Sequence, residues 1–255
     1  MILGAQLYTV RQFAQNEKDF DLTLQRVAAI GYTTVQISGI GNIPPATVRA
    51  LCDKHGLRIV LTHVDANRLL NDTEALIREH DILGCDYIGI GSMPDRYRHE
   101  AWMDRFAADY REPAKKIAAA GKLMMYHNHD FEFAMVRGKR VMEYLIEGFA
   151  PEEMGFTLDT YWLQNAGCDV GEWIARLKGR LPCVHLKDMD VKLVSGASRV
   201  VMAPVGEGNM NFAPLLEAFA QAGTKYLLVE QDTCLEDEFV CLEKSYKHVA
   251  KLGYK

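Results

Sequence analysis

Four short apolar runs of the sequence end in side chains that can bind a divalent metal ion. The four residues are His127, Asp159, His185 and Glu230. Two imidazoles and two carboxylates form a mixed nitrogen and oxygen set, which suits Mn²⁺, Co²⁺, Fe²⁺ or Zn²⁺ and leaves positions open for water or substrate hydroxyls. Mg²⁺ fits less well because it prefers oxygen ligands. The sequence therefore predicts one divalent metal ion, with Mn²⁺ as the first choice.

Further groups that can move a proton lie close to these ligands in the chain. His129 and Lys187 each follow a candidate ligand by two positions, so in an extended strand their side chains point to the same side as that ligand. The chemistry that they indicate begins with polarisation of a carbonyl by the ion and continues with transfer of the acidic proton beside it. The candidate acids and bases are Glu230, His129, Lys187 and Glu132.

Other polar and aromatic residues are candidates for contact with a polyhydroxylated substrate. Polar side chains at the ends of the first three apolar runs can bind hydroxyl groups, and aromatic rings that follow the ligand-bearing runs can stack on the apolar face of a sugar ring. The candidate substrate-binding residues are Gln6, Tyr8, Gln36, His63, Phe131 and Trp162.

The elements that must position these residues alternate along the chain. Amphipathic segments such as Phe20–Ile30, with apolar residues at three- and four-residue spacing, predict helices between the apolar runs. Eight runs are predicted as buried parallel strands: Leu3–Tyr8, Thr33–Ile37, Arg58–Thr62, Asp86–Ile90, Lys122–His127, Gly155–Asp159, Pro182–His185 and Lys225–Glu230. No linker divides the chain. We therefore predict a single (β/α)8 TIM barrel over residues 1–255, with its active site at the carboxyl ends of the strands.

An open, doubly wound sheet is the alternative fold for such an alternating pattern. That fold commonly carries a glycine-rich phosphate-binding fingerprint directly after its first strand. Here the first run continues into Tyr8–Gln12 without one, and the only dense turn of glycines and acids, Val205–Gly208, comes late and follows no strong predicted strand. The nucleotide-binding version of this fold is therefore disfavoured.

Composition, cysteine spacing and the pattern of apolar segments disfavour several classes of protein. The chain is 49% hydrophobic and 25% charged, with a net charge of -5, so it lacks the basic surface expected of a nucleic-acid-binding protein. Its six cysteines form no Cys-x-x-Cys pair, which favours reduced thiols in the cytoplasm. No segment resembles a secretion signal or a membrane span. We expect a small molecule as the partner, no nucleic acid and no membrane, and leave assembly into a homo-oligomer open.

Three longer motifs resemble those of the xylose isomerase-like barrel family. They are Phe156–Thr160, Val184–Asp188, and Pro204–Gly208 continuing through the next helix to Leu228–Asp232. This family includes sugar and sugar-phosphate isomerases and epimerases, inosose dehydratases and, more distantly, apurinic endonucleases. The resemblance covers nearly the whole chain and implies metal ligands at Asp159, His185 and Glu230.

Two positions depart from the family pattern. His127 stands where relatives commonly have a glutamate, and Trp162 stands where many have a substrate-binding histidine. Epimerases of the family use glutamates from the fifth and eighth strands on opposite faces of the substrate, and here only Glu230 remains. The resemblance implies a metal-dependent sugar or sugar-phosphate isomerase or epimerase type of enzyme. The His127 substitution favours one-base chemistry, so a keto-sugar or inosose dehydratase or lyase is the alternative.

Two other classes remain as weaker alternatives. A metal nuclease of the apurinic-endonuclease type needs additional His and Asp ligands, and the fourth predicted strand ends in Gly91-Ser92-Met93 without one. A sugar-binding barrel without catalytic activity would have no need of the complete ligand set.

Overall fold

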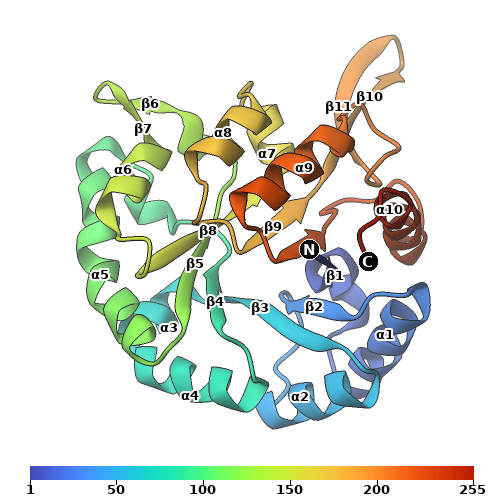
Figure 1. Cartoon of the computed structure of the whole chain (residues 1–255), viewed down its shortest axis with the longest axis horizontal. Coiled ribbons are helices and arrows are strands. Elements are labelled where there is room, and N and C mark those ends of the chain that lie inside the picture. The colour runs from blue at the N-terminus through green and yellow to red at the C-terminus, as the bar shows by residue number, and fades with distance from the viewer.

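The computed structural model describes all 255 residues and shows a closed barrel of eight parallel strands (Figure 1). The barrel strands are β1 (Ile2–Gln6), β2 (Thr34–Ile37), β3 (Arg58–Val64), β4 (Tyr87–Ile90), β5 (Leu123–His127), β8 (Met154–Asp159), β9 (Cys183–Leu186) and β12 (Tyr226–Val229). Each strand pairs with the next barrel strand along the chain, and β12 closes the ring by pairing with β1. The predicted (β/α)8 fold is confirmed, and each of the eight apolar runs overlaps one barrel strand.

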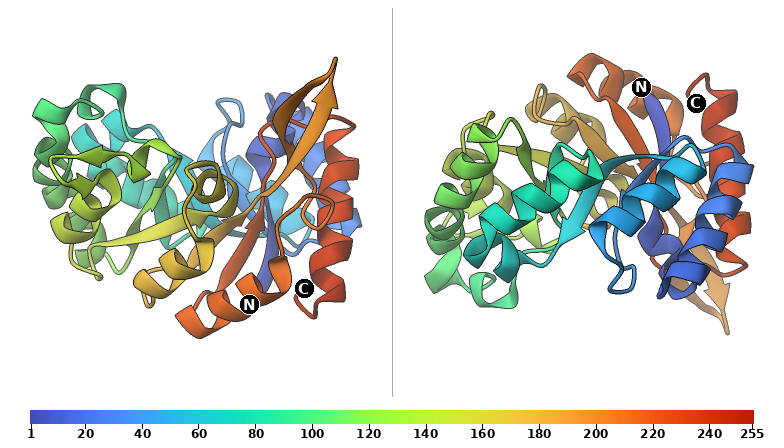
Figure 2. Two further views of the ribbon diagram at one scale, coloured as in Figure 1. Left: turned by 90° about the horizontal axis from the view of Figure 1, so that it is seen from above. Right: turned by 90° about the horizontal axis from the view of Figure 1, so that it is seen from below.

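Helices surround the barrel on its outside, as the two views of Figure 2 show. They are α1 (Glu17–Ile30), α2 (Pro45–Lys54), α3 (Ala66–Asn71), α4 (Thr73–Leu83), α5 (Met103–Ala119), α6 (Val141–Gly148), α7 (Thr160–Asn165), α8 (Val170–Arg176), α9 (Phe212–Ala222) and α10 (Glu238–Lys251). Helices α4 and α9 end at Gly84 and Gly223 with φ of 63° and 87°, a left-handed conformation that glycine adopts without strain. No helix combines the length and apolar character that a bilayer span requires.

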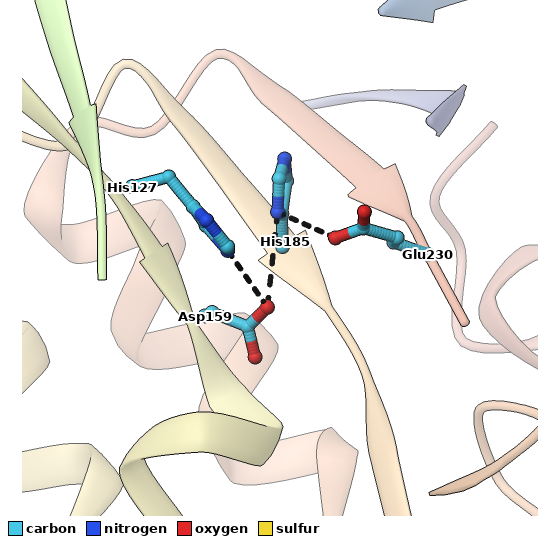
Figure 3. A group of neighbouring side chains, drawn as sticks. All are labelled: His127, Asp159, His185 and Glu230. Carbon is cyan, nitrogen blue, oxygen red and sulfur yellow. Dashed lines mark hydrogen bonds and ion pairs between the residues drawn. The ribbon is translucent and has the colours of Figure 1, made fainter. Parts of the chain in front are cut away.

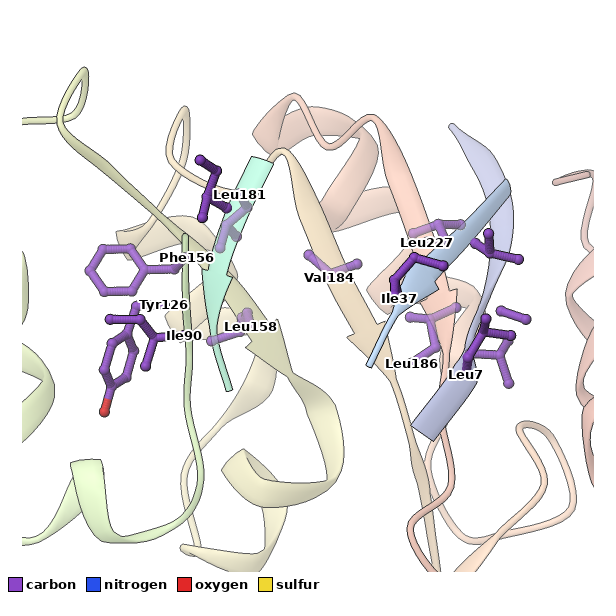
Figure 4. Packing of buried hydrophobic residues seen from close by; sticks show 14 of the residues in the cluster. Leu7, Ile37, Ile90, Tyr126, Phe156, Leu158, Leu181, Val184, Leu186 and Leu227 are labelled. Carbon is purple, nitrogen blue, oxygen red and sulfur yellow. The ribbon is translucent and has the colours of Figure 1, made fainter. Parts of the chain in front are cut away.

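The core has two parts because a barrel strand is covered on both faces. Side chains that point outward, such as Leu158 and Leu186, pack under the helices in a cluster of 58 buried residues (Figure 4). A smaller cluster contains Met125, Cys183 and Leu228, each of which precedes a candidate ligand by two positions. Alternation along a strand points these three residues to the same side as the ligands that follow them. The candidate ligands therefore continue a packed layer inside the barrel.

Two features of the structure differ from the sequence prediction. The first strand ends at Gln6 and not at Tyr8, because the Gln6 side chain accepts a hydrogen bond from Tyr8 N and begins a 3₁₀ helix over Leu7–Phe13. Two hairpins were not predicted: β6 (Met135–Val136) with β7 (Lys139–Arg140), and β10 (Asp188–Val194) with β11 (Ala197–Ala203), which projects from the barrel (Figures 1 and 2).

Candidate metal centre

The four predicted ligands converge at the carboxyl ends of four neighbouring strands (Figure 3). His127 ends β5, Asp159 ends β8, His185 lies in β9, and Glu230 directly follows β12. All four residues are buried, and one potential ligand atom from each lies within 4.8 Å of the others. The order of strands in the barrel explains this convergence, because β5, β8, β9 and β12 are adjacent and end at a common edge.

The distances within this group fit a divalent ion. His127 Nε2 lies 3.0 Å from Asp159 Oδ2, and His185 Nδ1 lies 2.8 Å from Glu230 Oε2 and 3.8 Å from Asp159 Oδ2. His185 Nδ1 is nevertheless a buried atom without a hydrogen-bond partner, because its short contact with Glu230 lacks hydrogen-bond geometry. Buried polar atoms left without a partner cost free energy. A cation between these atoms would remove that cost, so the donor set fits a metal ion.

Hydrogen bonds from behind fix the orientation of both histidines. Gln36 Oε1 accepts from His185 Nε2 at 2.7 Å, and the backbone oxygen of Gly91 accepts from His127 Nδ1 at 2.8 Å. An amide or backbone oxygen can only accept, so each of these ring nitrogens carries the proton. When the rings are neutral, the opposite nitrogens, His185 Nδ1 and His127 Nε2, carry the lone pairs and face the centre, which is the usual arrangement of a metal-binding histidine.

Lys187 places a positive charge at the same centre. Its side chain is 1% exposed, and Nζ lies 3.1 Å from Asp159 Oδ2, 2.9 Å from Glu230 Oε2 and 3.0 Å from Asp232 Oδ1. Burial alone would lower the pKa of Lys187, but these three carboxylates outweigh it and raise the pKa. Burial likewise opposes the charges of Asp159 and Glu230, but Lys187 and the histidines hold the pKa of both carboxyl groups well below the usual range. Burial alone would lower the pKa of His185, but the nearby carboxylates of Glu230 and Asp159 outweigh burial, so the pKa is raised.

Two further imidazoles flank the candidate ligands. The ring centres of His129 and His63 lie 4.9 Å and 5.4 Å, respectively, from the ring centre of His127. Burial lowers the pKa of His129 to about 3 and holds the pKa of His63 well below its usual value. Each ring has a buried nitrogen without a hydrogen-bond partner, Nδ1 in His129 and Nε2 in His63. Both rings are therefore neutral at pH 7, with hydrogen-bonding capacity to spare.

A cavity of about 840 Å³ opens above the centre, a size that is typical of small-molecule sites. The structure brings six of the predicted site residues into its wall: Tyr8, His63, His127, His129, Lys187 and Glu230. The wall also contains loop residues that the sequence analysis did not select, among them Arg11, Asp65, Ser92 and Arg98. These residues lie beyond the strand ends, and no periodic pattern in the sequence marks them.

The other predicted residues lie outside the cavity wall. Gln6 is buried and donates from Nε2 to Glu230 Oε1 at 3.0 Å, so it supports a ligand from behind. Glu132 is fully buried and accepts from Tyr126 Oη at 2.6 Å and from His129 N at 2.8 Å. Burial raises the pKa of Glu132 to about 7. Its position favours support of the His129 backbone, and its part in proton transfer stays a prediction.

The two predicted aromatic contacts pack beside His129. The centre of the Trp162 ring lies 5.1 Å from the centre of the His129 ring. The Phe131 ring stacks on the His129 ring, with 6.1 Å between the ring centres. Trp162 N also donates to Asp159 Oδ1 at 3.1 Å, so the start of α7 orients that carboxylate. Both aromatic side chains therefore enclose His129, and direct stacking on a substrate stays a prediction.

This geometry defines a (β/α)8 barrel with a buried candidate metal centre at the carboxyl ends of its strands. The chain belongs to the family described as xylose isomerase-like TIM barrel, whose model matches residues 24–238. No curated protein sequence is significantly similar to this chain.

Several solved structures share the fold. A sugar phosphate isomerase/epimerase from Parabacteroides distasonis ATCC 8503 superposes with a TM-score of 0.80 at 24% identity, covering 97% of this chain and 92% of that one. An L-ribulose 3-epimerase has a TM-score of 0.74 at 15% identity, covering 99% and 94%. A probable 3-DHS dehydratase from Bacillus anthracis has a TM-score of 0.72 at 13% identity, covering 98% and 99%. At these identities the likeness establishes the fold alone.

Proposed function

We propose that this chain is a divalent-metal-dependent enzyme of the sugar isomerase or epimerase type. Its reaction is proton transfer at the carbon next to the carbonyl of a small sugar or keto-sugar. The observation that carries this proposal is the convergence of His127, Asp159, His185 and Glu230 beneath a cavity of about 840 Å³. The family supports it, because solved relatives include proteins named as sugar isomerases and epimerases.

The ligand residues would hold the ion with Asp159 and Glu230 balancing its two positive charges. A divalent ion at this position, foremost Mn²⁺, supplies a Lewis acid that polarises a carbonyl oxygen. Lys187 keeps a fixed positive charge in the cavity wall, where it stabilises negative charge that develops on a substrate oxygen. His129 offers a neutral ring in the same wall for hydrogen bonding or proton transfer.

The metal content of single variants tests the site. His127→Ala, Asp159→Ala, His185→Ala and Glu230→Ala each remove one donor, and we expect each to lower the stoichiometry of Mn²⁺ after loading and gel filtration. His99→Ala is the matched control, because His99 is exposed and lies outside the cavity wall. Unchanged metal content in all four ligand variants would exclude this centre. Circular dichroism checks that the variants fold.

Proton exchange tests the reaction. The Mn²⁺-loaded protein is incubated in D₂O with aldoses, keto-sugars and inososes, and the products are followed by NMR. Deuterium at the carbon beside the carbonyl, with an isomer as product, supports the proposal. Absence of exchange with every sugar, in a protein shown to contain the metal, refutes it.

Elimination of water is the second candidate reaction, and the position of Lys187 favours it. The ammonium group lies in the cavity wall 3.0 Å from Asp232, where it can stabilise a leaving hydroxyl. Elimination begins with the same proton transfer as isomerisation, so the ligand set does not separate the two reactions. Appearance of an unsaturated or dehydrated product in the NMR assay identifies elimination.

A further inference from the structure

The glycine-rich turn Val205–Gly208, which the proposed chemistry does not use, forms an anion site that the protein itself fills. Gly206 N and Gly208 N donate to Asp188 Oδ2 at 2.9 and 3.0 Å, and Met189 N and Met210 N donate to Asp188 Oδ1 at 2.7 and 3.1 Å. Converging backbone N–H groups of this kind bind phosphate in many proteins. Here all four N–H groups bind the fully buried carboxylate of Asp188.

The position of this turn is the one at which a barrel enzyme would hold a phosphate group. Phosphate sites of (β/α)8 barrels are frequently built by the loops after the seventh and eighth strands. The turn belongs to the loop after β9, which is the seventh barrel strand. A Cβ atom on Gly208 would lie 2.4 Å from Asp188 Oδ1, so the turn closes tightly on this carboxylate and leaves no room for a second anion.

The arginines in the cavity wall are also engaged. Both terminal nitrogens of Arg11 donate to the backbone oxygen of Asp232 at 3.2 Å. Arg98 Nε donates to the backbone oxygen of Met93 at 2.8 Å, and its Nη1 pairs with Asp95 at 3.2 Å. These contacts occupy part of the donor capacity of both guanidinium groups and hold them against the protein backbone.

The charges around the cavity leave no positive excess for a phosphate dianion. The wall contains three cationic side chains, Arg11, Arg98 and Lys187, and four carboxylates, Asp65, Asp95, Glu230 and Asp232. A divalent ion would be matched by Asp159 and Glu230, and Lys187 by Asp232. A neutral ligand meets no such mismatch, because carboxylates, Ser38 and Asn67 in the wall can bind its hydroxyl groups.

We infer that the cavity takes a neutral, unphosphorylated sugar or polyol and discriminates against phosphate esters. This inference rests on the proposed function, because it names the substrate class of the same site. It separates this chain from the substrate class stated in the name of the sugar phosphate isomerase/epimerase whose fold it shares.

Paired ligands test the inference. Free sugars and their 6-phosphate esters, for example D-fructose and D-fructose 6-phosphate, are titrated into the Mn²⁺-loaded full chain by calorimetry, together with inorganic phosphate. We expect each ester to bind at least about tenfold more weakly than its free sugar, and inorganic phosphate not to bind the wild-type protein. An ester that binds as tightly as its free sugar, or millimolar binding of inorganic phosphate, overturns the inference.

A variant of the turn provides a second test that does not depend on the sugar. Asp188→Ala empties the four N–H groups, so inorganic phosphate should bind this variant and raise its melting temperature while leaving the wild type unchanged. Asp190→Ala is the matched control, since Asp190 lies on the same hairpin and accepts from Val191 N and Asn209 Nδ2 but not from the turn. If the Asp188→Ala protein is folded but neither binds phosphate nor gains melting temperature from it, this turn is not an anion site.

The same samples separate the two proposals. A binding preference for free sugars without deuterium exchange in D₂O means that the proposed reaction fails and the substrate class stands. Exchange with an ester at a kcat/KM equal to that of its free sugar means that the reaction stands and the substrate class fails.

Discussion

Removal of Lys187 should destabilise the metal-free protein far more than the metal-loaded protein. The Nζ atom is the one cationic group within 3.1 Å of both Asp159 Oδ2 and Glu230 Oε2. Lys187→Met keeps most of the side-chain volume and removes the charge. In the absence of metal, the two buried carboxylates then repel each other without a counter-charge, or must take up protons.

The size of the effect follows from burial. Leaving a buried charge without its partner costs about 3–5 kcal/mol, and Lys187 is 1% exposed, so no discount for solvent screening applies. For a 255-residue chain the entropy of unfolding is about 0.5 kcal/mol/K, so this cost corresponds to a fall in Tm of about 6–10 °C. A bound divalent ion neutralises the same oxygens, so the difference between variant and wild type should shrink when Mn²⁺ is added.

Differential scanning calorimetry in EDTA and in Mn²⁺ measures both quantities. Lys115→Met is the control, because its ion pair with Glu112 is exposed and its loss should change stability by less than about 0.5 kcal/mol. If Lys187→Met and the control variant have the same melting temperature in EDTA, Lys187 does not neutralise the two carboxylates. If Mn²⁺ leaves the difference unchanged, the ion and Lys187 do not share these oxygens.

Three other outcomes are expected. Gln36→Met removes the acceptor at His185 Nε2 and should weaken Mn²⁺ binding by about 10- to 100-fold. Competition with a fluorescent chelator measures this affinity, and an unchanged affinity would show that Gln36 does not support the metal ligand His185. Burial lowers the pKa of His80 to about 4, below the unfolded value of about 6.5, so its contribution to stability is present above pH 6.5 and is lost as the pH falls towards 4. Urea unfolding measures the free energy of unfolding at pH 7 and at pH 4.5. Between these two pH values the wild type should lose up to about 3 kcal/mol more of this free energy than His80→Gln, and equal losses in the two proteins would contradict the predicted sign. Trp162→Ala should slow proton exchange through loss of His129 packing, so a double variant with His129→Gln should be no slower than His129→Gln alone; additive losses would show that Trp162 acts separately.

The barrel and its ligand set could be predicted because both depend on local patterns. A strand buried on both faces reads as a continuous apolar run, and an inward ligand at its carboxyl end interrupts that run with a polar residue, as Asp159 does after Phe156-Thr157-Leu158. When four adjacent strands all end in this way, the four polar residues can be recognised together as one candidate site. The convergence of His127, Asp159, His185 and Glu230 follows from the topology without knowledge of any side-chain conformation.

The supporting residues could not be predicted, because their roles depend on contacts between distant segments. Gln6 was a candidate hydroxyl-binding residue, but it is separated from Glu230 by 224 positions in the chain and contacts its side chain directly. Glu132 lies only three positions from His129, but a 3₁₀ turn over Phe131–Phe133 points it into the core and away from the cavity wall. The β10–β11 hairpin was missed because most of its residues are exposed and alternate without a long apolar run.

His127 determines how charge is distributed over the candidate centre. Its Nδ1 donates to the backbone oxygen of Gly91 and its Nε2 would bind the proposed ion beside Asp159, so neither ring nitrogen would be free to take a proton from a substrate. A glutamate at this position would bring a third carboxylate to a centre that already holds Asp159 and Glu230 beside a single fixed cation, Lys187. With a neutral imidazole there, two carboxylates match a divalent ion, and an ion with fewer anionic ligands withdraws more charge from a carbonyl oxygen. In the proposed reaction, a histidine at this position would supply one base fewer than a glutamate and would leave a more strongly polarising ion, which favours proton transfer on one face of the substrate over transfer between two opposed carboxylates.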